Sequence, residues 1–101
     1  MARSRLDFQR ELKKYAPKAY YMRPLGNHMD YPCFVYKHIS PKQVRADNLN
    51  YLTVNGYEVL YISDTENEGI IETMSRAFGN CSAGAPYIVD DLFHYPFTIY
   101  Y

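Results

Sequence analysis

The sequence predicts an α+β domain in which a small, mostly antiparallel sheet carries two helices. Three observations lead to this fold class. Residues 57–62 (YEVLYI) alternate between two faces, as a strand of a half-covered sheet does. Residues 70–78 change to a helical period, with apolar side chains along one stripe. Short strand patterns surround that helix, so we expect a single domain over residues 1–101 with the element order α-β-β-β-α-β-β.

The first half of the chain predicts one helix, two short strands and a long polar segment. An apolar side on residues 4–15 predicts the helix, and Pro17 ends it. The strands follow at 19–22 and at 33–39 (CFVYKHI). Residues 40–50 are polar and longer than an ordinary hairpin connection. We therefore expect them to form an extended hairpin tip that leaves the body of the domain.

The third strand is predicted over residues 51–62 and contains an Asn55-Gly56 pair. This pair could be the turn of a hairpin. The pieces on either side of it read as one strand, however, so we predict a β-bulge or a close backbone approach there. The odd-numbered residues from 57 to 61 then share one face of the sheet, and the even-numbered residues share the other.

The second helix is predicted after Ser63. Its apolar stripe consists of Ile70, Ile71, Met74, Ala77 and Phe78. Thr65 and Glu68 have the spacing of a capping box at the start of the helix, and Gly79 is placed to end it. This helix should pack its apolar stripe onto the sheet.

Small residues dominate the segment that follows the second helix. Residues 80–86 (NCSAGAP) predict a loop, and strands at 87–89 and 93–101 complete the sheet. The two consecutive aspartates between these strands should form the turn that connects them. Pro96 lies within the last strand, so we expect that strand to lie at an edge of the sheet or to contain a bulge.

The composition restricts the class of function. The 11 basic and 11 acidic side chains give no net charge, which argues against a general nucleic-acid binder. The 12 tyrosines suit either a β-rich sheet or surfaces that become buried in an assembly. Two cysteines define no disulfide framework, and no apolar run is long enough to span a membrane. We therefore expect a protein of the reducing cytosol with no membrane partner.

Four metal-capable side chains lie close together in the sequence: His28, Asp30, Cys33 and His38. Their spacing matches no closed zinc pattern. Strand alternation also places His38 on the face opposite to Cys33. We therefore expect no metal site and no cofactor.

Two further kinds of site stay open from the residues alone. Cys81 and His94 could act as a nucleophile and its base, although no third orienting group is apparent. Alternatively, Tyr36, Tyr57 and Tyr61 could stack single-stranded bases on a tyrosine-rich sheet. The lack of Lys and Arg among these tyrosines argues against the second possibility.

Several segments resemble the small tail terminator proteins of long-tailed bacteriophages, also called tail completion or head–tail joining proteins. They are the strand YPCFVYKHI, the passage RADNLNYLTVNGYEVLYISDTE and the acidic helix NEGIIETM. The final aromatic strand HYPFTIYY also fits the pattern. The resemblance covers most of the chain and includes no catalytic signature.

The resemblance implies a structural virion protein and no enzyme. Its subunits would form a ring, expected to be a hexamer, at the head-proximal end of the tail tube. The ring would end tail polymerisation, contact the tail tube protein and the head completion or connector protein, and let DNA pass through its pore. The protein would be in the host cytoplasm during assembly and in the tail of the virion afterwards.

The resemblance also implies where the subunit would touch its neighbours. The segments 40–50 and 80–86 are the candidate contacts to other subunits or to the tube, although 80–86 is longer than in the shorter members of the family. The individual candidate residues are Arg45, Asp47, Asn48, Asn50, Asn80, Ser82 and Ala83.

Overall fold

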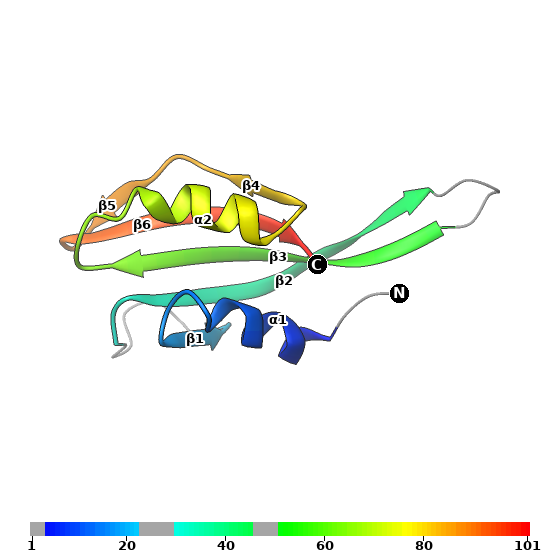
Figure 1. The fold of residues 1–101 in the computed structure, drawn as a ribbon, viewed down its shortest axis with the longest axis horizontal. Coiled ribbons are helices and arrows are strands. Elements are labelled where there is room, and N and C mark those ends of the chain that lie inside the picture. The colour runs from blue at the N-terminus through cyan, green and yellow to red at the C-terminus, as the bar shows by residue number, and fades with distance from the viewer. Residues whose placement is uncertain (1–3, 23–29, 46–50) are drawn as a thin grey trace.

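The computed structural model describes residues 4–22, 30–45 and 51–101, with the backbone alone at 40–45 and 51–54. It has the predicted α+β architecture, with two helices on one face of a six-stranded sheet (Figure 1). The elements in chain order are α1 (Arg5–Leu12), β1 (Lys18–Tyr21), β2 (Cys33–Arg45), β3 (Tyr51–Ser63), α2 (Gly69–Ala77), β4 (Cys81–Ala83), β5 (Tyr87–Val89) and β6 (Leu92–Tyr100).

The sheet has the strand order β1-β2-β3-β6-β4, and β5 also pairs with β6. β1 runs parallel to β2, and the other pairs are antiparallel. β4 and β5 lie one after the other along the outer side of β6, because Cys81 is opposite Ile99 and Tyr87 is opposite His94. Together they make one interrupted edge strand.

The core lies between the helices and the sheet. The residues of β3 alternate as predicted: Tyr57, Val59 and Tyr61 face the helices, whereas Glu58 and Leu60 face the other side. β2 and β6 add aromatic and aliphatic side chains to the same layer. The remaining buried members of the core are Phe8, Leu12, Ala16, Phe34, Tyr36, Ile70, Met74, Phe78, Tyr95, Phe97 and Ile99.

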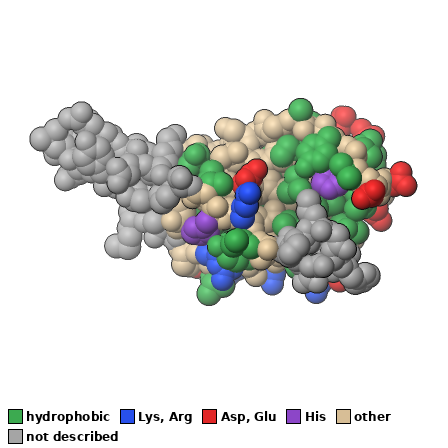
Figure 2. All heavy atoms as spheres, turned by 180° about the vertical axis from the view of Figure 1, so that it is seen from behind, with side chains coloured by type: hydrophobic (Ala, Val, Ile, Leu, Met, Phe, Trp, Pro, Cys, Tyr) green, Lys and Arg blue, Asp and Glu red, His purple; other side chains and the backbone are tan. Residues whose placement is uncertain are grey.

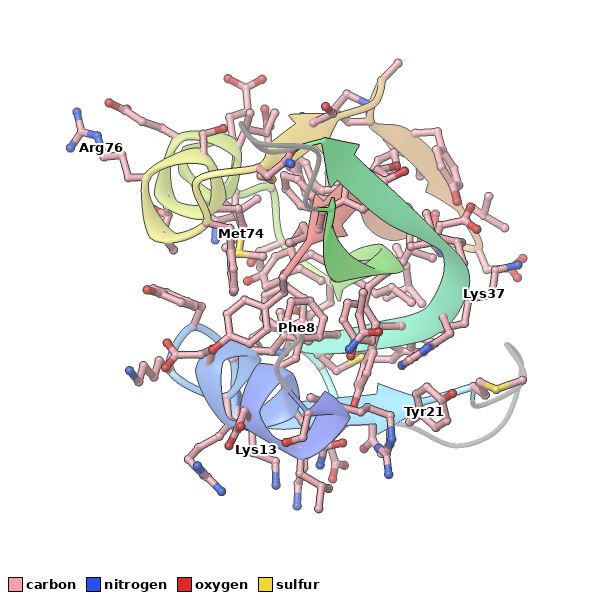
Figure 3. All side chains as sticks on the ribbon, turned by 90° about the vertical axis from the view of Figure 1, so that its right-hand side faces the viewer. Phe8, Lys13, Tyr21, Lys37, Met74 and Arg76 are labelled. Carbon is pink, nitrogen blue, oxygen red and sulfur yellow. The ribbon has the colours of Figure 1, made fainter. Side chains whose placement is uncertain are left out.

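Phe8 joins the two helices to the middle of the sheet (Figure 3). Its ring stacks on Tyr57 with the centroids 4.1 Å apart and an interplanar angle of 10°. It also meets Phe78 at the end of α2, with the centroids 5.5 Å apart. Aromatic contacts of this kind contribute beyond the area that they bury. Lys13 points away from the core on the opposite side of α1.

Polar contacts fix α1 at its start and along its length. The side chain of Ser4 accepts a hydrogen bond from the backbone N–H of Asp7 at 3.2 Å, which caps the first turn. The Tyr36 hydroxyl donates to Gln9 Oε1 at 2.6 Å and accepts from Arg5 Nη1 at 3.2 Å. The helix ends at Leu12, about one turn earlier than predicted, because the amides of Lys14 and Tyr15 donate to carbonyls only three residues back.

The start of α2 differs from the predicted capping box. Neither Thr65 nor Glu68 caps the helix with its side chain. The backbone N–H of Asn67 instead donates to the Tyr95 hydroxyl at 2.9 Å, and its side-chain amide donates to the Tyr61 hydroxyl at 3.2 Å. Two phenol groups of the sheet therefore hold the chain where α2 begins, a long-range arrangement that local spacing does not reveal.

β2 and β3 extend beyond the rest of the sheet as a two-stranded arm, which we define as residues 42–45 paired with 51–54. β6 pairs with β3 only from Gly56 onward, so the arm leaves the body along the long axis of a molecule measuring 50 × 23 × 21 Å (Figure 1). This confirms the predicted extended hairpin, although its strands continue further than expected, to Arg45 and from Tyr51.

A β-bulge separates the arm from the body beside Gly56, but it lies on β2 and not at Asn55-Gly56 of β3, where it was predicted. Ile39 pairs with Gly56 and Lys42 pairs with Val54, so two residues of β2 face one residue of β3. The extra residue therefore lies on β2, where Pro41 has no N–H to contribute to the ladder.

Two predictions about the last strands are wrong. The segment 80–86 was predicted to be a loop, but residues 81–83 form β4. Pro96 was expected to place its strand at an edge or in a bulge, but β6 pairs with β3 on one side and with β4 and β5 on the other. Pro96 is tolerated because its carbonyl oxygen faces the edge strand, where it accepts from Gly84 N–H at 2.9 Å. Its missing N–H faces the same side, in the gap between β4 and β5. A Cβ atom on Gly84 would lie 3.1 Å from Pro96, so the close approach favours glycine.

Candidate functional site

The sheet face opposite the helices carries a shallow hollow of about 360 Å³. Val35, Leu60, Pro96, Tyr87 and Met22 line it with apolar surface. Lys37 and Glu58 also line it and form an ion pair of 3.4 Å. Both side chains are more than half exposed, so the pair contributes at most about 1 kcal/mol to stability. The hollow therefore offers an apolar contact surface with one exposed ion pair.

The edge strand β5 exposes three consecutive apolar side chains. Tyr87, Ile88 and Val89 have exposed fractions of 45%, 62% and 48%. The ring of Tyr87 stacks on His94, with the centroids 4.9 Å apart and an interplanar angle of 11°. Exposed apolar residues on an edge strand commonly mark a site of association. Sequence reasoning identified β5 as a strand but missed its exposure, which depends on its position at the edge.

A second hollow, of about 200 Å³, lies on the helix side of β5. We call it the acidic hollow and define it by Glu66, Glu68, Pro86, Ile88 and Phe93. The two carboxylates come from the turn before α2, and the apolar lining comes from Pro86, β5 and β6. The lining of the hollow therefore combines apolar surface with two carboxylates.

Charges of opposite sign lie on opposite sides of the molecule. Residues 4–22, which form α1 and β1, include five basic and two acidic side chains. Residues 63–101, from the end of β3 through β6, include six acidic side chains and one basic side chain. In Figure 2 the basic side chains gather along the lower edge and the acidic ones near the β5–β6 end. The net charge is therefore zero although positive and negative side chains are concentrated in different segments. Counting the charged residues segment by segment reveals this from the sequence alone.

The predicted contact residues fall on two separate surfaces. Arg45 ends β2 in the arm, opposite Tyr51, and Asp47, Asn48 and Asn50 lie outside the described residues. Asn80, Ser82 and Ala83 are exposed at the β4 edge of the body. The Asn80 carbonyl accepts from Tyr100 N–H at 3.0 Å, and Ser82 pairs with Thr98. The described members therefore belong to the arm and to the β4 edge, and they do not form one site.

The structure separates Cys81 from His94. Cys81 pairs with Ile99, five residues along β6 from His94, which corresponds to roughly 16 Å. Cys81 packs against the core under the helices, whereas His94 stacks on Tyr87 and its Nδ1 lies 2.9 Å from the Leu92 carbonyl. Burial also raises the pKa of the Cys81 thiol, which disfavours the thiolate. These two residues cannot act together as a nucleophile and a base.

The tyrosines considered for base stacking are buried. Tyr36, Tyr57 and Tyr61 have exposed fractions of 1%, 0% and 3%, and α1 and α2 cover them. These rings offer no free face to a nucleotide base. The expectation that His38 lies opposite to Cys33 is confirmed, because His38 meets Tyr57 edge-on at 4.5 Å while Cys33 packs with Ile62 on the other face. His28 lies outside the described residues.

Among the residues that the structure describes, no three His, Cys, Asp or Glu side chains are grouped so that they could hold a metal ion. The described helices are too short and too polar to cross a membrane. Comparisons with protein-family models, with curated proteins and with solved structures find no match to this chain.

Proposed function

We propose that this chain is a structural subunit of a bacteriophage tail, a tail terminator that assembles with copies of itself into a ring. The ring would cap the head-proximal end of the tail tube, end its polymerisation and present a surface to the head connector. The resemblance of the strand and helix segments to that family motivates the proposal. The arm and the exposed strand β5 support it, because both are surfaces suited to association.

The arm is the observation on which the proposal depends most. An isolated two-stranded ribbon is marginally stable in water, so a ribbon that projects from a domain gains from being covered by a partner. The arm projects along the long axis, away from the helices and from the β4–β5 edge (Figure 1). A subunit of this shape can hold one neighbour with its body and reach another component with its arm.

The exposed strand β5 provides a second surface at the other end of the sheet. A ring requires two different surfaces on each subunit, because each copy must contact the next one head to tail. The arm, the β4–β5 edge and the α1 side give the molecule several distinct surfaces. Edge strands of a soluble domain are usually shielded, and the exposure of β5 is explained if another subunit covers it.

The proposal can be tested with an armless variant. Replacing residues 43–53 with Asn-Gly places a two-residue turn directly after the Lys42–Val54 pair and keeps the bulge and the body. We expect this variant to keep the circular dichroism spectrum and melting temperature of the parent chain. We also expect it to lose the ability to cap tail tubes, measured by electron microscopy of tube ends and by co-sedimentation.

The parent chain serves as the positive control in the same assay. It should form rings or bind tube ends, and native mass spectrometry should detect the oligomer. A parent chain that stays monomeric and never associates with tail tubes would overturn the proposal. An armless variant that caps tubes as well as the parent chain would show that capping does not require the arm.

A further inference from the structure

We infer that subunits associate head to tail by docking the outer face of α1 of one copy into the acidic hollow beside β5 of the next copy. This inference rests on the proposed function, because it specifies which two surfaces form the contact between subunits. It depends on the distribution of charge and of exposed apolar side chains over the described residues.

The outer face of α1 presents one apolar side chain among cations. Leu6 is 60% exposed, and Arg10 and Lys13 follow it at i+4 and i+7 on the same face of the helix. Arg10 pairs with Asp7, but the structure gives Lys13 no acidic partner among the described residues. Figure 3 shows Lys13 pointing outward, on the side of α1 opposite to Phe8.

The acidic hollow has the complementary character. Ile88 and Phe93 form part of its apolar lining, and the exposed Glu66 and Glu68 also line it. Neither glutamate has a basic partner among the described residues. An aliphatic side chain flanked by cations matches a small apolar hollow flanked by carboxylates. A contact of this kind places apolar burial at its centre and charge pairs at its rim, as protein interfaces usually do.

The exposed apolar residues support the same pairing of surfaces. The described large apolar side chains with high exposure are Leu6, Met22, Tyr87, Ile88 and Val89. Two of them belong to the α1–β1 side and three belong to β5. These sides lie at opposite ends of the sheet order, so one copy can use both at once (Figure 1). Such a heterologous contact can continue from copy to copy and close into a ring.

Charge reversal tests the inference. One variant carries Arg10→Glu with Lys13→Glu, and a second carries Glu66→Lys with Glu68→Lys. Either variant alone should associate about tenfold more weakly than the parent chain, because like charges would then face each other across the contact. A mixture of the two variants should recover the association. Analytical ultracentrifugation gives the association constants, and circular dichroism verifies that each variant is folded.

A matched control swaps the same kinds of charge elsewhere on the surface. Lys37→Glu with Glu58→Lys reverses the exposed pair on the sheet face opposite the helices and keeps the two charges complementary. This double variant should associate as the parent chain does. Raising the salt from about 0.01 M to about 1 M should weaken the parent association, because the screening length falls from about 30 Å to about 3 Å.

Three outcomes overturn the inference, and only one of them also overturns the proposed function. Reversal variants that assemble as well as the parent chain would place the interface elsewhere and leave the ring proposal intact. Variants that weaken association singly but show no recovery when mixed would also overturn this pairing of surfaces. A parent chain that is monomeric at about 1 mM and also absent from tube ends would overturn both proposals.

Discussion

The buried thiol of Cys33 has a raised pKa. Its side chain is fully buried beside Ile62, and burial, with a smaller contribution from Asp30, raises the pKa of its thiol from 9.0 to about 11. The folded chain therefore keeps this proton at a pH at which the unfolded chain releases it. The stability that results is fully present below pH 9 and is lost as the pH rises through 11.

We predict that the free energy of unfolding falls between pH 9 and pH 11 by on the order of 2 kcal/mol through Cys33. Burial also raises the pKa values of Tyr36 and Tyr57, and these two groups add to the fall at the alkaline end. Urea unfolding at a series of pH values measures the effect. A Cys33→Ala variant should show a smaller fall, and an identical fall in both proteins would refute the assignment.

Side-chain orientation could be predicted well wherever a strand alternates without interruption. Tyr57, Glu58 and Val59 lie on the faces that their spacing predicts, because a regular strand turns each successive side chain to the opposite face. Exposure could not be predicted in the same way. Tyr36 and Tyr87 are the same residue type on strands, yet one is buried under helices and the other is 45% exposed at an edge.

At the scale of elements, the β5–β6 hairpin depends on a turn that its residues fit imperfectly. Val89 pairs with Leu92, so Asp90 and Asp91 are the two turn residues, and their φ angles are 52° and 62°. Two-residue hairpins favour positive φ at both positions, where Asn-Gly and Asp-Gly are the preferred pairs. Aspartate tolerates this region less well than glycine.

We predict that Asp91→Gly stabilises the protein by about 0.5–1 kcal/mol, because glycine adopts the required backbone conformation without steric cost. The melting temperature should rise by a few degrees for a domain of this size, as measured by circular dichroism. Asp64→Gly is the matched control, since its φ is not in the positive region. That variant should be neutral or slightly destabilised, and equal stabilisation of both variants would contradict the argument.

The elements that the sequence did not predict depend on distant partners. β4 consists of Cys81, Ser82 and Ala83, small residues without strong strand preference, and it forms because β6 offers its outer side. Pro96 argues against a strand with neighbours on both sides, because proline has no N–H for the ladder. The edge strand is interrupted between β4 and β5 beside Pro96, so no hydrogen bond from its nitrogen is required there. The start of α2 likewise depends on hydroxyl groups from β3 and β6. Local spacing contains none of this information.

At the scale of the whole molecule, the described strands differ in how many neighbours hold them. β3 lies in the middle of the sheet, between β2 and β6, and its central residues are buried. The arm has a single ladder, and β5 is a three-residue strand at the edge. Local opening should therefore cost most free energy in the body of β3 and least in β5 and the arm.

Hydrogen exchange of the monomer at low concentration checks this expectation. We predict the slowest amide exchange within Val59–Ile62 of β3. Exchange should be at least about a hundredfold faster at Tyr87, whose amide pairs with β6 opposite His94, because opening β5 exposes little of the core. Mass spectrometry of peptic fragments, or NMR, measures the rates. Equal protection of β5 and β3 in a verified monomer would show that the edge is held more firmly than its pairing implies.

The candidate site could be predicted only in part, for a reason that belongs to the whole molecule. The described part of the segment 40–50, residues 40–45, leaves the body as expected, because the length and polarity of the segment are local properties. The acidic hollow was missed, since Glu66 and Glu68 line it together with Ile88 and Phe93 only once the chain has folded. A surface of this kind is a property of the fold and has no continuous signature in the sequence.

The aromatic layer under the helices gives this chain an optical signal of its own. The chain has no tryptophan, and Phe8, Tyr36, Tyr57 and Tyr95 are held in fixed orientations within the core. Fixed, asymmetric surroundings make tyrosine rings contribute to circular dichroism in the near ultraviolet, and this signal disappears when specific packing is lost. The integrity of the interior can therefore be followed spectroscopically, without a label, in every variant described above.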